Sequence, residues 1–132
     1  MNETFTPKKA IAIDFDGVIH KYSKGWYDGT IYDEPVEGSH EALMELKQQF
    51  NVFIHTTRNI EDVVNWMNSK FWGEGEKGFN TIPMYEGYKF WNGNFFGDIA
   101  VSNRKLPAVA YIDDRAIRFT NWKKIIEEGI PV

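Results

Sequence analysis

The chain has 132 residues, a formal net charge of -4 and no cysteine, a length that predicts a single domain spanning 1–132 with its own hydrophobic core. The absence of cysteine excludes disulfides, zinc-thiolate sites and cysteine nucleophiles, and the negative charge disfavours non-specific binding to nucleic acid. Because no apolar run is long enough for a membrane helix and no apolar signal-peptide core precedes residue 10, we expect a cytoplasmic protein without a membrane partner.

The segment from Ala10 to Ile13 is short, apolar and partly β-branched, which predicts a strand buried on both faces. Asp14 and Asp16 follow at its carboxyl end, where open α/β sheets bind ligands. Since residues i and i+2 of an extended segment point the same way, both carboxylates are expected to face one pocket. Such a pair indicates a bound metal, a nucleophile with a proton carrier, or both. A solvated acidic turn is the alternative for Asp-x-Asp alone.

The next stretch, Lys21 to Pro35, is rich in glycine, tyrosine and charged residues. Asp28-Gly29 stands there between aromatic and β-branched residues, a pattern that predicts a hairpin. We expect a short flap over the carboxylates, and a surface hairpin without a role is the alternative. His20, just before this stretch, is a candidate general base, but packing under the flap is the favoured interpretation.

A helix and a second strand are predicted next. Ser39 is expected to cap a helix that runs to about Phe50. The apolar run Val52–His55 predicts a buried strand, in which core packing is the favoured role of His55. This strand ends in two hydroxyls and a base, Thr56-Thr57-Arg58.

Asn59 is expected to cap another helix, because acidic residues follow it and apolar residues recur at helical spacing. These apolar residues predict a core face: Ile60, Val63, Val64, Met67 and Phe71. From Trp72 to Asn103 the periodicity is lost among glycines and aromatics, so we expect short strands or a small insertion there. The aromatics favour a satellite hydrophobic cluster, with stacking on bases or sugars as the alternative.

The end of the chain repeats the strand-then-acid pattern. Ala108–Ile112 predicts a third buried strand, which ends in Asp113-Asp114. A last helix is expected from Asn121 to Glu128, with Gly129 as its stop. Its inward side chains are predicted to be Trp122, Ile125 and Ile126.

Strands that alternate with helices predict a parallel sheet, which brings the carboxyl ends of its strands to one edge. The polar residues expected to meet there are Asp14, Asp16, Thr56, Lys105, Asp113 and Asp114.

In this order the motifs resemble those of the haloacid dehalogenase superfamily. Ile13-Asp14-Phe15-Asp16-Gly17-Val18 is similar to its first motif, and Thr56 matches the hydroxyl that ends the second motif strand. Lys105 resembles the lone lysine of the third motif, and Asp113-Asp114 the acids of the fourth. The resemblance covers about Lys9 to Arg118 and implies a Rossmann-like sheet flanked by helices.

The resemblance also implies roles for the matched residues. Asp14 would be the nucleophile that forms an aspartyl-phosphate, and Asp16 the acid and base that carries a proton. Mg²⁺ would be held by Asp14, the backbone carbonyl of Asp16 and Asp114, with Asp113 in or beside its shell. Thr56 and Lys105 would contact the phosphoryl group. Thr57 and Arg58 are weaker candidates for phosphate or substrate contact, and a helix-entry role is the alternative for Arg58.

Within the superfamily, an acid at the position of Asp16 favours phosphoryl transfer. The short flap and the small insertion at 72–103 resemble capless members, which often take large substrates or close their site by forming homo-oligomers. We therefore expect a magnesium-dependent phosphomonoester hydrolase. The alternatives are a phosphatase for nucleotides or nucleic-acid ends, and a non-catalytic module that binds metal and phosphate.

Overall fold

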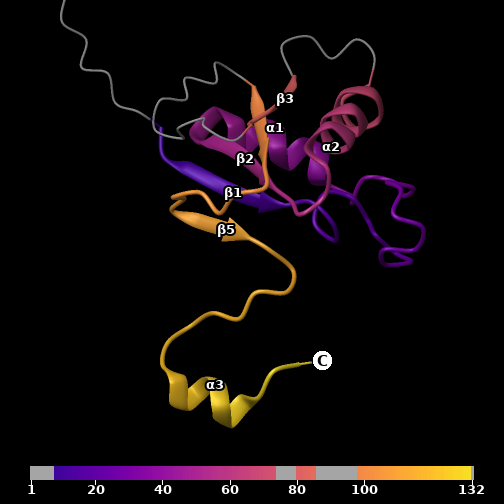
Figure 1. Ribbon diagram of the computed structural model, residues 1–132. Coiled ribbons are helices and arrows are strands. Elements are labelled where there is room, and N and C mark those ends of the chain that lie inside the picture. The colour runs from indigo at the N-terminus through magenta and orange to yellow at the C-terminus, as the bar shows by residue number, and fades with distance from the viewer. Residues whose placement is uncertain (1–7, 74–79, 86–97, 132) are drawn as a thin grey trace, which may run out of the picture.

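The protein is an α/β structure built on one parallel sheet. The computed structural model describes residues 8–73, 80–85 and 98–131 (Figure 1). Within these ranges, five strands pair in the order β3-β4-β2-β1-β5, and every pairing is parallel. The strands are β1 (Ala10–Asp14), β2 (Asn51–His55), β3 (Thr81–Pro83), β4 (Ile99–Ser102) and β5 (Ala110–Ile112). The parallel sheet predicted from the alternation of strands and helices is confirmed.

Two helices cover one face of this sheet. They are α1 (Ser39–Gln49) and α2 (Ile60–Trp66), and α2 continues into a single π-helical segment, η1 (Met67–Phe71). Their apolar side chains form one buried cluster with the odd-numbered face of β1. The core face predicted for the second helix is confirmed, because Val63, Val64, Met67 and Phe71 are buried and Ile60 packs against the cluster.

The opposite face of the sheet carries a smaller cluster, made of Ala12, Phe53, Met84, Ala100 and Leu106. Successive residues of β1 and β2 therefore contact different clusters, as expected for strands buried on both faces. β1 lies between β2 and β5, with Asp14 opposite His55 and Ile13 opposite Ile112. The carboxyl end of β1 is thus flanked by the ends of two parallel neighbours.

Two local predictions are wrong. Ser39 does not cap α1: the cap residue is Gly38, and the Ser39 hydroxyl donates a hydrogen bond to the carbonyl of Val36 instead. Asp28-Gly29 does not join two strands, because no strand lies between residues 21 and 35. The turn exists, with the Gly29 amide donating to the carbonyl of Trp26. The two ends of the loop meet in an isolated antiparallel bridge between His20 and Pro35, and side-chain hydrogen bonds hold the residues between them.

The end of the chain departs further from expectation. β5 is the edge strand and all three of its residues are exposed, so the prediction of a third buried strand is wrong. The last helix, α3 (Trp122–Glu128), begins after the cap Asn121 and ends at Gly129 as predicted. It has no buried residue, however, and Figure 1 shows it in yellow well away from the sheet. Its predicted inward face is therefore exposed.

The stretch 72–103 contributes two short strands, as the sequence allowed. β3 and β4 belong to the main sheet rather than to a separate insertion. Most of the aromatic segment, residues 74–79 and 86–97, lies outside the described residues, and the predicted aromatic cluster with it. Among the described helices, none combines the length and the apolar character that crossing a membrane requires.

Candidate functional site

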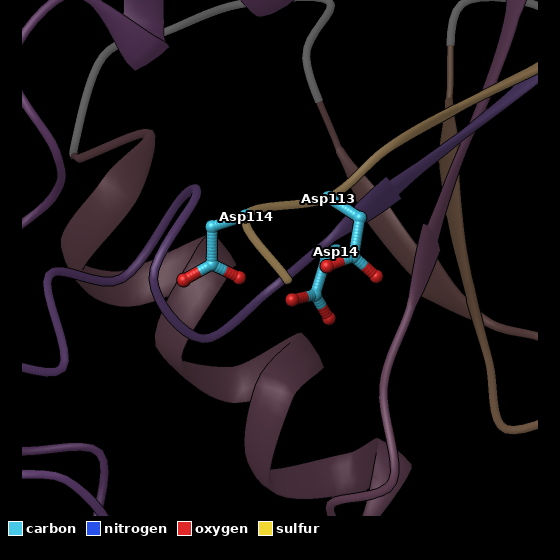
Figure 2. Close-up of side chains that lie close together, drawn as sticks. All are labelled: Asp14, Asp113 and Asp114. Atoms are coloured by element: carbon cyan, nitrogen blue, oxygen red, sulfur yellow. The ribbon is translucent and has the colours of Figure 1, made fainter. Parts of the chain in front are cut away.

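Three carboxylates meet at the carboxyl edge of the sheet. Asp14 is the last residue of β1, and Asp113 and Asp114 directly follow the neighbouring strand β5. One oxygen from each side chain lies within 4.8 Å of the other two (Figure 2). The parallel pairing of β1 with β5 explains this convergence, because it places the two strand ends side by side.

Gly17 allows Asp114 to approach this closely. Its φ angle of 87° lies in the left-handed region that favours glycine. A β-carbon at this position would also overlap the Asp114 carboxylate. The glycine that follows Asp-x-Asp in the sequence therefore serves both the turn and the contact with the other acidic strand end.

The electrostatics of the three carboxylates favour a cation. Burial and then the charge of Asp113 raise the pKa of Asp14 to about 6, with smaller contributions from Asp114 and Asp16, against a hydrogen bond from the Phe15 amide that lowers it. Within the described ranges, no lysine or arginine forms an ion pair with any of the three. Side chains in the described part of the chain therefore leave these negative charges uncompensated, an arrangement that a bound cation would stabilise.

The donor set is compatible with a hard divalent cation, a class that includes Mg²⁺. All three candidate ligands are carboxylates, hard oxygen donors of the kind that Mg²⁺ prefers, and the exposure of Asp113 and Asp114 leaves room for water. With neither histidine nor cysteine in the cluster, the donors do not resemble those of a typical zinc site.

Asp16 does not join these three carboxylates. Its Oδ1 lies 2.8 Å from Nδ1 of His20, and its Oδ2 accepts a hydrogen bond from Nε of Arg58 at 2.7 Å. Partial burial alone would raise the pKa of Asp16, but the hydrogen bonds from His20 and Arg58 outweigh burial and hold it below its usual value. Asp16 is therefore an anion in this arrangement.

His20 is fully buried, and it is both a packing residue and a polar contact. Its ring stacks on Phe15 and meets Trp66 edge-on. Its Nε2 accepts a hydrogen bond from the backbone amide of Asp33, so the proton of the neutral ring lies on Nδ1 and is donated to Asp16. The sequence interpretation recognised the packing and missed the contact with Asp16, which the turn after β1 creates by folding His20 back toward Asp16.

Arg58 is a buried part of this region rather than a mere helix-entry residue. It is 5% exposed and, besides Asp16, it binds the carbonyl of Gly29 through Nη1 at 2.9 Å. Its guanidinium carbon lies 4.6 Å from the centre of the Trp26 ring. Its last nitrogen, Nη2, is buried and has no hydrogen-bond partner among the described residues.

The turn after β2 is braced by its own hydrogen bonds. Thr56 is buried, and its hydroxyl oxygen accepts a hydrogen bond from the backbone amide of Arg58 at 3.0 Å. The side-chain amide of Asn103 donates to the carbonyls of both Thr56 and Arg58. Asn103 was missed from the sequence, where a polar residue after an apolar run gives no sign of a contact 47 residues away. Thr57 is exposed.

Lys105 lies apart from the carboxylates in this structure. Its Nζ is 5.5 Å from the centre of the Tyr111 ring, and it is absent from the charges that shift the pKa of Asp14. Of the six residues predicted to meet, the structure thus groups Asp14 with Asp113 and Asp114. Asp16 contacts Arg58, Thr56 braces the same turn, and Lys105 remains outside.

The fold and the site define an α/β protein with an acidic cluster at the carboxyl edge of a parallel sheet. Comparisons with protein-family models, with curated proteins and with solved structures give no match. Membership of the haloacid dehalogenase superfamily therefore stays a prediction from the sequence motifs.

Proposed function

We propose that the protein is a magnesium-dependent phosphomonoester hydrolase that acts through an aspartyl-phosphate on Asp14. The observation that carries the proposal is the convergence of Asp14, Asp113 and Asp114, whose oxygens lie within 4.8 Å of one another. The sequence predicted this meeting from acidic residues at the ends of strands that alternate with helices, and the parallel pairing of β1 with β5 gives it a physical basis. The same proposal includes a fold of the haloacid dehalogenase type and a role for the 21–35 loop as a flap over the carboxylates.

The metal would be held by the carboxylates of Asp14 and Asp114 and the backbone carbonyl of Asp16, with Asp113 in or beside the shell. When bound, Mg²⁺ supplies positive charge that lets an anionic carboxylate approach an anionic phosphoryl group. It would also oppose the burial and the neighbouring carboxylates that raise the pKa of Asp14, because a cation favours the ionised form of a carboxylate.

Asp14 would perform the bond-making step. One of its carboxylate oxygens attacks phosphorus, a bond forms between that oxygen and phosphorus, and the ester bond to the alcohol breaks. Water then attacks the phosphorus of the acyl phosphate, which releases inorganic phosphate and restores the Asp14 carboxylate. The ionised form of Asp14 is the nucleophile, so activity should require it.

Asp16 would give a proton to the leaving alcohol and take one from the attacking water. In the arrangement described above it is ionised, and Arg58 opposes its protonation. A phosphoryl group that drew Arg58 toward itself would weaken this ion pair and allow Asp16 to hold a proton. Arg58 would thus have two roles. It would contact the phosphate, and its movement would change the pKa of Asp16.

Thr56 and Lys105 would complete the phosphate contacts. The Thr56 oxygen accepts a hydrogen bond from the Arg58 amide, which leaves the hydroxyl hydrogen free for a phosphoryl oxygen. Lys105 would have to leave the Tyr111 ring to reach the phosphate, and Thr57 is an exposed residue that a bound substrate could contact. Each donor of this kind typically contributes a few kcal/mol to the transition state.

The test is release of inorganic phosphate from a panel of phosphomonoesters, with Mg²⁺ or with a chelator. We expect metal-dependent turnover that Asp14→Asn reduces by about 10³-fold or more, since loss of the nucleophile removes the covalent route. Asp62→Asn is the matched control, because Asp62 is an exposed aspartate on α2 outside the cluster, and it should keep full activity.

Undiminished activity of Asp14→Asn would rule out the mechanism. If no ester is hydrolysed although Mg²⁺ binds, the protein is instead a metal-binding module without this chemistry.

A further inference from the structure

The 21–35 loop presents a large aromatic side chain next to the proposed site. Trp26 is 56% exposed although it stands in a loop that is tied down by hydrogen bonds. The phenol of Tyr32 bridges the amide of Lys24 and the carbonyl of Gly25, and Asp33 binds Ser23. The position of Trp26 is therefore set by the loop and is not that of a freely moving surface residue.

Two contacts fix the Trp26 ring itself. Gly29 closes the turn against it so tightly that a β-carbon there would lie 3.3 Å from the indole. The guanidinium of Arg58 lies 4.6 Å from the ring centre, a distance at which a cation and an aromatic ring attract each other. Arg58 is buried, so it supports the ring from the protein side, while Trp26 as a whole residue is 56% exposed.

The same arginine connects this ring to the proposed site. Its Nε binds Asp16, and Asp16 lies two residues after Asp14. Its Nη2 is buried without a partner among the described residues, and such a donor needs an acceptor, which either a water molecule or a ligand can supply. A ligand that carries both an anionic group and a planar ring could accept a hydrogen bond from Nη2 of Arg58 and stack on the exposed side chain of Trp26.

We infer that Trp26, supported by Arg58 and Gly29, is a stacking platform for the base of a phosphorylated nucleoside. An aromatic ring held in place before binding loses little freedom when a second ring stacks on it. Stacking suits any nucleobase, because each base offers a π-face. This inference rests on the proposed function and specifies its substrate class as a phosphomonoester whose alcohol carries a nucleobase.

The inference is tested by comparing substrates with and without a base. KM and kcat are measured for adenosine 5′-monophosphate and for ribose 5-phosphate, which lacks only the base, and the ratio of the two KM values is the readout. Trp26→Ala and Trp26→Leu should each reduce this preference for the nucleotide by about tenfold. Trp26→Phe should retain most of it, because a six-membered ring remains.

Trp122→Ala is the matched control, since Trp122 is a more exposed tryptophan, at 72%, on the distant α3. It should keep the preference of the natural protein. A 5′-phosphorylated oligonucleotide forms a third arm, and better turnover of either the oligonucleotide or the free nucleotide supports the platform, because both present a base. An unchanged KM ratio in both Trp26→Ala and Trp26→Leu would overturn it.

The two proposals fail in different ways. If the natural protein hydrolyses none of these esters, binding of adenosine 5′-monophosphate in the presence of Mg²⁺ is measured by calorimetry for the same variants. Binding that weakens in Trp26→Ala would keep the platform while the hydrolase proposal falls, and absence of binding would overturn the platform too. Turnover with the same KM ratio in every Trp26 variant would leave the hydrolase standing and remove the platform.

Discussion

Asp14 and Asp16 are two residues apart, and the structure gives their carboxyl groups opposite electrostatic surroundings. Burial and neighbouring carboxylates raise the pKa of Asp14 to about 6. For Asp16, hydrogen bonds from His20 and Arg58 outweigh burial and lower the pKa. The sequence interpretation expected both side chains to face one pocket, but in the structure Asp16 points to Arg58 and His20, while Asp14 faces the other acidic strand end.

The raised pKa of Asp14 makes the stability of the metal-free protein depend on pH. Between pH 3.8, the ordinary value, and about 6, the folded state holds more protons on Asp14 than the unfolded state does. The contribution of this group to stability is thus fully present below pH 3.8 and is lost as pH rises through 6. In EDTA at pH 7 we expect Asp14→Asn to melt a few degrees above the natural protein.

This difference should shrink toward pH 4, where Asp14 is largely protonated in the folded protein. Thermal unfolding followed by circular dichroism at several pH values measures it, with Asp62→Asn as the control that shows no such trend. An Asp14→Asn protein that melts below the natural one at pH 7 in EDTA would contradict the raised pKa of Asp14.

Among the local elements, the turn after β1 depends most on one residue. Gly17 has a φ of 87° and no room for a β-carbon beside Asp114. Gly17→Ala should therefore displace Asp114 and weaken Mg²⁺ binding by about tenfold or more. Titration calorimetry with Mg²⁺ provides the measurement.

Gly25→Ala is the control for backbone strain alone. Gly25 also has a positive φ, 64°, but nothing lies within 4 Å of the position that its β-carbon would take. Gly25→Ala should lower the stability of the protein, because alanine is strained in the left-handed backbone conformation, and it should leave the affinity for Mg²⁺ unchanged. Equal loss of affinity in both variants would contradict a specific role of Gly17 in placing Asp114.

The helix caps show which features of a helix start can be predicted from the local sequence. Asn59 was predicted as a cap and Asn121 as the start of the last helix, and each caps its helix by accepting a hydrogen bond from the amide three residues on. Ser39 is also of a residue type that suits a cap, but its hydroxyl donates to the carbonyl of Val36, and the residue before α1 is Gly38 with a φ of 84°. A residue type that suits a cap thus predicts the helix start to within a residue, and the surrounding backbone decides which residue caps it.

Across the whole molecule, the hydrophobic core is uneven between the two sides of β1. Ile13 on β1 and Ile112 on β5 are partners in the sheet, but Ile13 is 2% exposed and Ile112 is 42% exposed. Ile13→Ala should lower the free energy of unfolding by about 3 kcal/mol, since it leaves a cavity in the core. Ile112→Ala should cost about 1 kcal/mol or less, because much of the side chain already contacts water.

Denaturation in urea measures both values, and the pair is matched in residue type and in register. A loss for Ile112→Ala as large as that for Ile13→Ala would contradict the exposed position of β5. It would show that the outer strand is covered in solution.

Local patterns in the sequence were sufficient to predict the α/β class, the parallel sheet, the strands β1 and β2, the core face of α2 and the meeting of Asp14 with Asp113 and Asp114. Apolar periodicity, which depends on residues close together in the chain, predicts the elements. The general rule that parallel strands end at one edge of a sheet then brings the acidic strand ends together. Only the tertiary structure decided that β5 and α3 are exposed, that Arg58 is buried against Asp16, and that Trp26 and Asn103 stand beside the same turn. These contacts join residues dozens of positions apart, and burial depends on what packs against a segment, which its own sequence does not specify.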